Sequence, residues 1–145
     1  MKKEEYEPLF GPGFHDVSLE NLNETLTQLL VEPFPNSKCR ADLLQNLFVL
    51  IEKIKSDITR VFLEMWIDGS FVTKKEEPKD IDIVIMYAAG AHVSQELQNH
   101  DRWKKIYCCD VYYVEFGNRL LKDYYEDWFG SDRNNCPKGI IRICF

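Results

Sequence analysis

Hydrophobic residues recur with two different periods along this chain of 145 residues, and each period predicts a different element. A spacing of three and four residues is typical of amphipathic helices and predicts four of them, over residues 19–30, 43–54, 91–103 and 118–129. Runs rich in β-branched and aromatic residues predict four strands, over residues 61–67, 81–87, 106–114 and 139–145. Because these strands are apolar on both faces, helices should cover the sheet, and the predicted fold class is α/β or α+β.

The chain is expected to form a single domain over residues 1–145, because it contains neither an internal repeat nor an interdomain linker. Pro33 and Pro35 separate an N-terminal arm, residues 1–35, from the rest. Ser18 is expected to cap the helix of the arm. Asn118 and Gly130 should begin and end the last helix.

Two aspartates open the predicted strand 81–87. Asp80 and Asp82 should project from one face of the strand, because side chains two residues apart share a face. Neighbouring carboxylates repel unless a cation or a proton compensates, and a set of oxygen ligands favours Mg²⁺ or Mn²⁺ over Zn²⁺. Asp110 lies in the next predicted strand among apolar residues and needs a partner. If the two strands are neighbours, the three carboxylates form one cluster.

A Gly-Ser turn precedes these aspartates. Gly69 and Ser70 follow the predicted end of a strand at Asp68, and the nine residues 71–79 separate Ser70 from Asp80. Glycine permits close approach of the backbone and serine adds a hydroxyl, so such a turn can hold phosphate oxygens. Phosphates beside paired cations indicate phosphoryl-transfer chemistry.

The amino-acid composition limits the classes of binding partner that this protein can have. Eighteen basic against 24 acidic residues give a net charge of −6, which argues against diffuse binding to a nucleic-acid backbone. No apolar stretch approaches the roughly 20 residues that span a bilayer, so we expect a cytoplasmic protein without a membrane partner. The five cysteines include no CxxC pair, and neither a disulfide framework nor a cysteine zinc site is indicated.

Several other side chains have two interpretations. Arg133 and Lys138 either meet a phosphate or acidic acceptor or form an ordinary surface turn. The three histidines lack metal-ligand spacing and are expected to be surface or packing residues. Four aromatic residues of the last helix could stack a base, but their helical spacing favours core packing; they are Tyr124, Tyr125, Trp128 and Phe129.

Taken together, Gly69-Ser70, the gap of nine residues, Asp80-x-Asp82 and the later Asp110 resemble the signature of the polymerase-β-like nucleotidyltransferase superfamily. The segments PGFHDVSLENL, WIDGSFVTKKEEPKDIDIVI and WFGSDRNNCPKGIIRI are similar to a group of small prokaryotic and phage nucleotidyltransferase-like proteins. The resemblance implies a minimal nucleotidyltransferase fold, a mixed sheet backed by helices.

The same resemblance implies roles for the residues. Asp80 and Asp82 would ligate two Mg²⁺ or Mn²⁺ ions, Asp110 would ligate the catalytic one, and Gly69 and Ser70 would hold a nucleoside triphosphate. The sequence departs from many family members after Ser70, where Phe, Val and Thr replace small and basic residues, and no additional helical domain follows. The acceptor therefore stays open: RNA, a protein or a small molecule.

Two functions of different kinds follow. The first is a metal-dependent nucleotidyltransferase that moves a nucleotidyl group from a nucleoside triphosphate to an acceptor and releases pyrophosphate. The second is a binding or regulatory module of the same fold with little or no catalysis, such as one half of a toxin–antitoxin or phage-defence pair, in which a protein partner completes the cleft. A plain metal-binding or structural α/β protein is a third interpretation.

Overall fold

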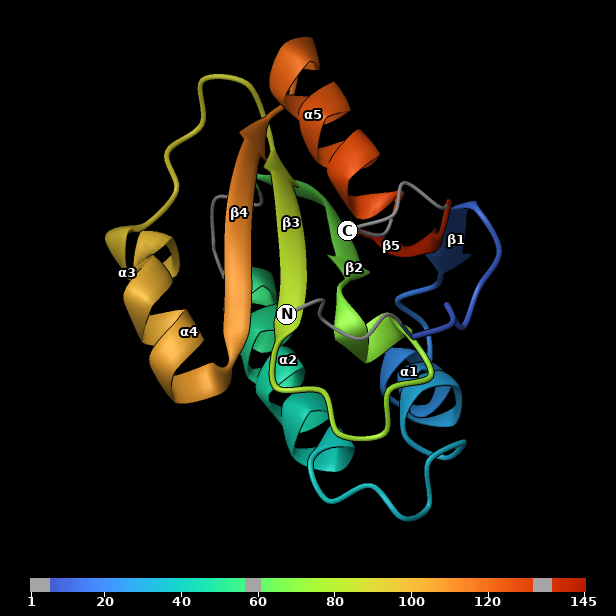
Figure 1. The fold of residues 1–145 in the computed structure, drawn as a ribbon. Coiled ribbons are helices and arrows are strands. Elements are labelled where there is room, and N and C mark those ends of the chain that lie inside the picture. The colour runs from blue at the N-terminus through green and yellow to red at the C-terminus, as the bar shows by residue number, and fades with distance from the viewer. Residues whose placement is uncertain (1–5, 57–60, 132–136) are drawn as a thin grey trace.

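A five-stranded mixed sheet is the centre of the computed structural model, which describes residues 6–56, 61–131 and 137–145 (Figure 1). Its spatial order is β1-β5-β2-β3-β4. β1 pairs with β5 and β3 pairs with β4 in parallel, whereas β2 pairs with β3 and β5 in antiparallel fashion. The strands are β1 (Gly13–Val17), β2 (Phe62–Asp68), β3 (Ile81–Tyr87), β4 (Cys109–Glu115) and β5 (Gly139–Cys144).

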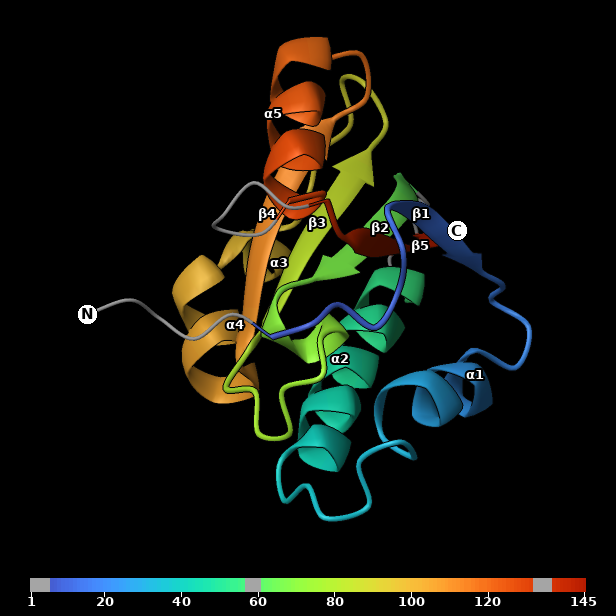
Figure 2. The same ribbon diagram turned by 45° about the vertical axis from the view of Figure 1, so that its right-hand side comes forward.

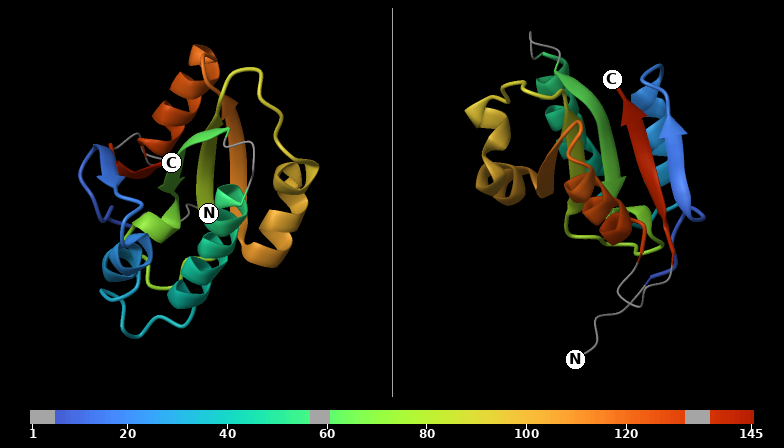
Figure 3. Two further views of the ribbon diagram at one scale, coloured as in Figure 1. Left: turned by 180° about the vertical axis from the view of Figure 1, so that it is seen from behind. Right: turned by 90° about the horizontal axis from the view of Figure 1, so that it is seen from above.

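Helices lie on both sides of this sheet. They are α1 (Leu22–Leu30), α2 (Arg40–Lys55), α3 (Gln95–Gln98), α4 (His100–Tyr107) and α5 (Arg119–Phe129), and a 3₁₀ turn, η1, spans Ser70–Val72. Figures 2 and 3 show α1 and α2 on one face and α5 on the other. The predicted fold class, a mixed α/β architecture, is confirmed. Among the described residues, no helix has the length and apolar character needed to cross a bilayer.

The two faces of the sheet enclose two cores. Ile83 and Ile85 of β3 point into the larger core, which they share with α1, α2 and α4. Val84, between them, points the other way and packs beneath α5 with Trp66 and Phe129. Each fully buried side chain of this size contributes roughly 1.5–3 kcal/mol. The alternation of the central strands therefore fixes which residues face α5, and the candidate site lies on that face.

Two predicted boundaries are wrong. The single helix expected over residues 91–103 is two helices, α3 and α4, and α4 continues to Tyr107, so the strand expected from residue 106 begins at Cys109. The reason is local capping: Oγ of Ser94 accepts a hydrogen bond from the N–H of Leu97, and Oδ1 of Asn99 accepts one from the N–H of Arg102. A second cap inside the segment starts a new helix.

The segment predicted to be an arm takes part in the sheet and in the core. β1 was not predicted, because its sequence GFHDV is short and carries His15 and Asp16. It is held by its backbone pairing with β5 and by an ion pair between Asp16 and Arg142 at 2.6 Å. The helix of this segment begins at Leu22 with Asn21 at its N-cap, and not after Ser18.

Candidate functional site

Three aspartates lie in one row at one end of the neighbouring strands β2, β3 and β4. The strand register pairs Asp68 of β2 with Asp82 of β3, and Asp82 with Asp110 of β4. All three occupy the alternate positions that face α5, in line with Trp66, Val84 and Tyr112. We call these three residues the carboxylate row. The expectation that the strands of Asp82 and Asp110 are neighbours is confirmed.

Asp80 lies directly before β3 and is half-buried rather than part of the strand. It is near enough to Asp82 for its charge to raise the pKa of Asp82. The residue that completes the row is instead Asp68, for which the sequence predicts only the end of a strand.

The Gly-Ser turn brings its backbone against the row. Gly69 has φ 84°, a conformation that favours glycine, and a Cβ at this position would collide with Oδ2 of Asp82. Ser70 begins η1, which is closed by a hydrogen bond of 3.1 Å from the N–H of Val72 to the carbonyl of Gly69. Gly69 and Ser70 therefore lie beside the carboxylates with which the sequence grouped them.

A fully buried arginine holds the loop that follows this turn. All five N–H groups of Arg40 donate to backbone carbonyl oxygens, at 2.5–3.2 Å, and the acceptors belong to Leu30, Phe71, Thr73 and Lys75. Its guanidinium also lies 3.6 Å from the centroid of the Phe34 ring. Burial lowers the pKa of Arg40 to about 10. Arg40 thus ties the start of α2 and the end of α1 to the turn beside the carboxylates.

Cationic side chains flank the row at both ends. Nζ of Lys138 lies 3.0 Å from Oδ2 of Asp68, and the two side chains are 14% and 2% exposed. At the other end, Nζ of Lys104 lies 3.8 Å from Oδ2 of Asp110. Because Lys138 forms a buried ion pair, the interpretation of this residue as part of an ordinary surface turn is excluded. Arg133 lies outside the described residues.

His100 and Tyr112 also contact Asp110. Nε2 of His100 lies 3.1 Å from Oδ1 of Asp110, and its Nδ1 lies 3.1 Å from the carbonyl oxygen of Val111. The hydroxyl of Tyr112 donates to Oδ2 of Asp110 at 3.2 Å. A carbonyl partner at Nδ1 turns Nε2 toward the row. Neither metal-ligand spacing nor any other motif indicated this role for His100.

Burial and the charges of neighbouring carboxylates make the charged forms of Asp68 and Asp82 unfavourable. Burial raises the pKa of Asp82 to about 7, and the charges of Asp80 and Asp110 act in the same direction. Burial likewise raises the pKa of Asp68 to about 7, against the opposing effect of Lys138. Oδ1 of Asp68 is buried and accepts no hydrogen bond from the described residues. A buried carboxylate oxygen without a partner is unfavourable unless a cation or donor reaches it.

The charge balance at this site fits a divalent cation. Four carboxylates, those of Asp68, Asp80, Asp82 and Asp110, face two ammonium groups, those of Lys104 and Lys138. This excess of two negative charges favours the binding of divalent cations, and oxygen ligands suit both Mg²⁺ and Mn²⁺. Within the described ranges, no group of three or more histidine, cysteine, aspartate or glutamate side chains is arranged as a set of metal ligands.

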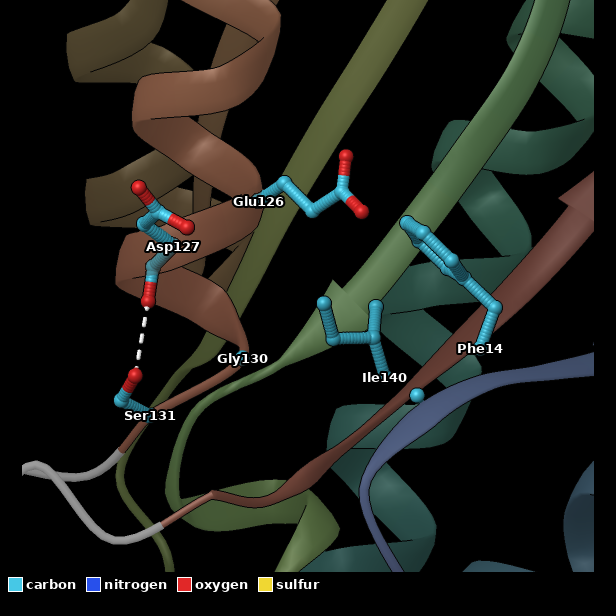
Figure 4. Close-up of a pocket in the computed structure, with 7 residues that line it drawn as sticks. Phe14, Glu126, Asp127, Gly130, Ser131 and Ile140 are labelled. Atoms are coloured by element: carbon cyan, nitrogen blue, oxygen red, sulfur yellow. Dashed lines mark hydrogen bonds between the residues drawn. The ribbon is translucent and has the colours of Figure 1, made fainter.

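A hollow of about 230 Å³ lies on the same face of the sheet, beside the C-terminal end of α5 (Figure 4). Phe14, Ile140 and Glu126 line it, together with Asp127, whose carbonyl oxygen accepts a hydrogen bond from Ser131. None of the residues predicted to form the site lines this hollow.

The fold and the site together define an α/β protein with a buried carboxylate row next to a glycine-serine turn. The chain belongs to a family of unknown function, DUF6932, whose family model matches residues 3–144. Neither a curated protein nor a solved structure matches it significantly. The resemblance to nucleotidyltransferases therefore depends on the residues themselves.

Proposed function

We propose that this protein is a metal-dependent nucleotidyltransferase that moves a nucleotidyl group from a nucleoside triphosphate to an acceptor. The observation that carries the proposal is the carboxylate row, in which Asp82 lies between two other carboxylates and against the backbone of Gly69. The unpartnered Oδ1 of Asp68 supports it as well, because a cation would supply the missing partner. The proposed fold is correspondingly a minimal nucleotidyltransferase fold.

In this proposal, Asp80, Asp82 and Asp110 hold two Mg²⁺ or Mn²⁺ ions, and Gly69 and Ser70 hold the triphosphate. The bound ions would activate the acceptor hydroxyl and neutralise the departing pyrophosphate. Asp110 takes the proton of the acceptor hydroxyl while the new bond to the α-phosphorus forms and the bond to pyrophosphate breaks.

The flanking cations have a role in the same proposal. Lys138 and Lys104 offset part of the negative charge of the row. Ammonium groups in this position would also pair with the oxygens of a bound phosphate.

Label transfer tests the proposal. The protein is incubated with each α-labelled nucleoside triphosphate, Mg²⁺ and a cell lysate, and the label is followed into RNA, protein and small molecules. We expect transfer by the wild type, loss in Asp82→Asn and Asp110→Asn, and full transfer in Asp123→Asn, a change at an exposed position of α5. Label transfer by Asp82→Asn at the wild-type rate would contradict the proposal.

The second candidate is a binding or regulatory module with the same fold and little or no catalysis, as in a toxin–antitoxin or phage-defence pair. One observation favours it: the outer carboxylates of the row are paired with cationic or imidazole side chains, those of Lys138, Lys104 and His100. It predicts a protein partner whose association survives Asp82→Asn. A pull-down that recovers no partner under conditions where label transfer occurs would contradict it.

A cytoplasmic location is also part of the proposal. The described cysteines, Cys39, Cys108, Cys109 and Cys144, are all free. Free thiols persist in a reducing compartment.

A further inference from the structure

Four aromatic side chains form a continuous surface between β4 and α5. Tyr112 belongs to β4, whereas Tyr124, Tyr125 and Trp128 belong to α5. The ring of Tyr112 lies 5.4 Å from those of both Tyr125 and Trp128, and the ring of Tyr124 lies 5.3 Å from that of Tyr125. We call these four residues the aromatic edge.

Half of this cluster does not pack in the core. The prediction of core packing is confirmed for Phe129, which is buried, and for Tyr125, which packs against the smaller core. It is wrong for Tyr124 and Trp128, which are 62% and 48% exposed. The ring of Trp128 lies against that of Tyr112 of β4, and the ring of Tyr124 lies 6.3 Å from that of Trp128. Large aromatic rings left in water are typical of binding surfaces.

The aromatic edge begins where the carboxylate row ends. Tyr112 follows Asp110 by two residues on the same face of β4, an advance of about 6.6 Å along the strand. Its hydroxyl donates to Oδ2 of Asp110, and its ring contacts Trp128. The surface therefore changes from ion-binding groups to aromatic faces within one step along the strand. A nucleotide changes from phosphates to a base over a similar length.

We propose that the aromatic edge stacks the base of the nucleotide whose phosphates bind at the carboxylate row, with Trp128 and Tyr124 as the exposed rings. This inference rests on the proposed function, because the Gly-Ser turn and metal ions at the row must hold the phosphates. Every base has a π face that can stack on tryptophan or tyrosine, so we expect all four nucleoside triphosphates to bind with similar affinity.

The hollow on the other flank of α5 fits a base less well. The carboxylate of Glu126 points into it (Figure 4) and would repel the phosphates attached to that base. The aromatic edge carries no carboxylate of its own, and Lys104 approaches the Asp110 end of the row beside it.

Calorimetry with two kinds of probe distinguishes the contribution of the base to binding affinity from that of the phosphates. The probes are ATP, GTP, CTP and UTP, each with Mg²⁺, and inorganic tripolyphosphate with Mg²⁺. We expect Trp128→Ala to weaken the nucleotides about 10-fold and to leave tripolyphosphate unchanged. Trp128→Phe should retain most of the affinity because it keeps a ring. Phe116→Ala removes another ring, 59% exposed, outside this cluster, and should change neither probe.

Each outcome has one meaning. If tripolyphosphate binds as tightly as the nucleotides, or if Trp128→Ala weakens neither, base stacking is refuted while phosphate binding at the row stands. If Asp82→Asn leaves tripolyphosphate binding intact, or if no probe binds, the proposed function fails and the inference fails with it. If Trp128→Ala instead abolishes self-association in sedimentation and leaves nucleotide affinity intact, the aromatic edge is a protein interface and the inference is overturned. Circular dichroism and the urea midpoint establish that each variant is folded.

Discussion

Replacing Asp82 by asparagine should stabilise the metal-free protein, although Asp82 is the residue on which the proposed site depends most. Asp82 lies at the centre of the carboxylate row, between Asp68 and Asp110. Asparagine has nearly the same shape and no charge, so the substitution removes the repulsion and leaves the packing intact. A gain in stability from the loss of a functional group is expected where a site is strained for its function.

The magnitude follows from the pKa of Asp82, which burial and neighbouring charges raise from 3.8 to about 7. Between these two values the folded state binds a proton that the unfolded state has released, so the free energy of unfolding falls as the pH rises. A difference of about three pH units at about 1.4 kcal/mol each sets an upper limit of about 4 kcal/mol. Because Asp82 keeps some contact with solvent, we expect about half of this, about 2 kcal/mol.

Urea unfolding with EDTA, followed by circular dichroism at pH 5 and pH 8, measures this difference. At pH 8 the midpoint of Asp82→Asn should exceed that of the wild type by about 1 M, and at pH 5 by less. Mn²⁺ should then raise the midpoint of the wild type and not that of the variant. The exposed control Asp123→Asn should match the wild type at both pH values. A variant that is less stable than the wild type at pH 8 would refute the reasoning.

Three further substitutions test the surroundings of the site by the same urea assay. Arg40→Met deprives four backbone carbonyls of their donors and should lower the free energy of unfolding by about 4 kcal/mol. The control Arg119→Met, at an exposed position, should change it by less than about 0.5 kcal/mol. A small effect at Arg40 would show that water replaces the guanidinium. Lys138→Met leaves the buried carboxylate of Asp68 unpaired and should lower the free energy of unfolding by about 3 kcal/mol at pH 8. The loss should be smaller at pH 5, where that carboxylate is protonated. Equal losses at both pH values would argue against the ion pair. Gly69→Ala places a methyl group against the carboxylate of Asp82 in a backbone conformation that alanine avoids. It should lower the free energy of unfolding by about 2 kcal/mol and abolish metal binding measured by calorimetry. Unchanged metal binding would show that the turn can move away.

Local sequence patterns predict most of the strands and the position of the central aspartate of the site, Asp82. The alternation in DIDIVIM placed Asp82 on the face opposite Ile83, and this is how β3 is built. Asn118 and Gly130 flank α5 as predicted, because capping depends on adjacent residues. Both inferences use interactions that lie within a few positions along the chain.

The remaining part depends on contacts between distant segments. Asp68 becomes part of the row only because β2 pairs with β3 in a register that sets it opposite Asp82. Lys138 reaches Asp68 because β5 lies next to β2, and no local motif encodes that neighbourhood. His100 contacts Asp110 because a second cap, at Asn99, starts α4 beside β4. Such pairings follow from tertiary packing and cannot be derived from spacing alone.

The position of β5 has a consequence for how the chain folds as it is synthesised. Among the described strands β5 is made last, yet it lies inside the sheet, between β1 and β2. Its pairing with β1 joins residues 126 positions apart, as in the contact between Asp16 and Arg142. Closing so long a loop is entropically unfavourable and slows folding. Until β5 inserts, β2 has an open edge and Lys138 has not reached Asp68. The ion pair that neutralises the β2 end of the carboxylate row therefore forms only in the last step of folding.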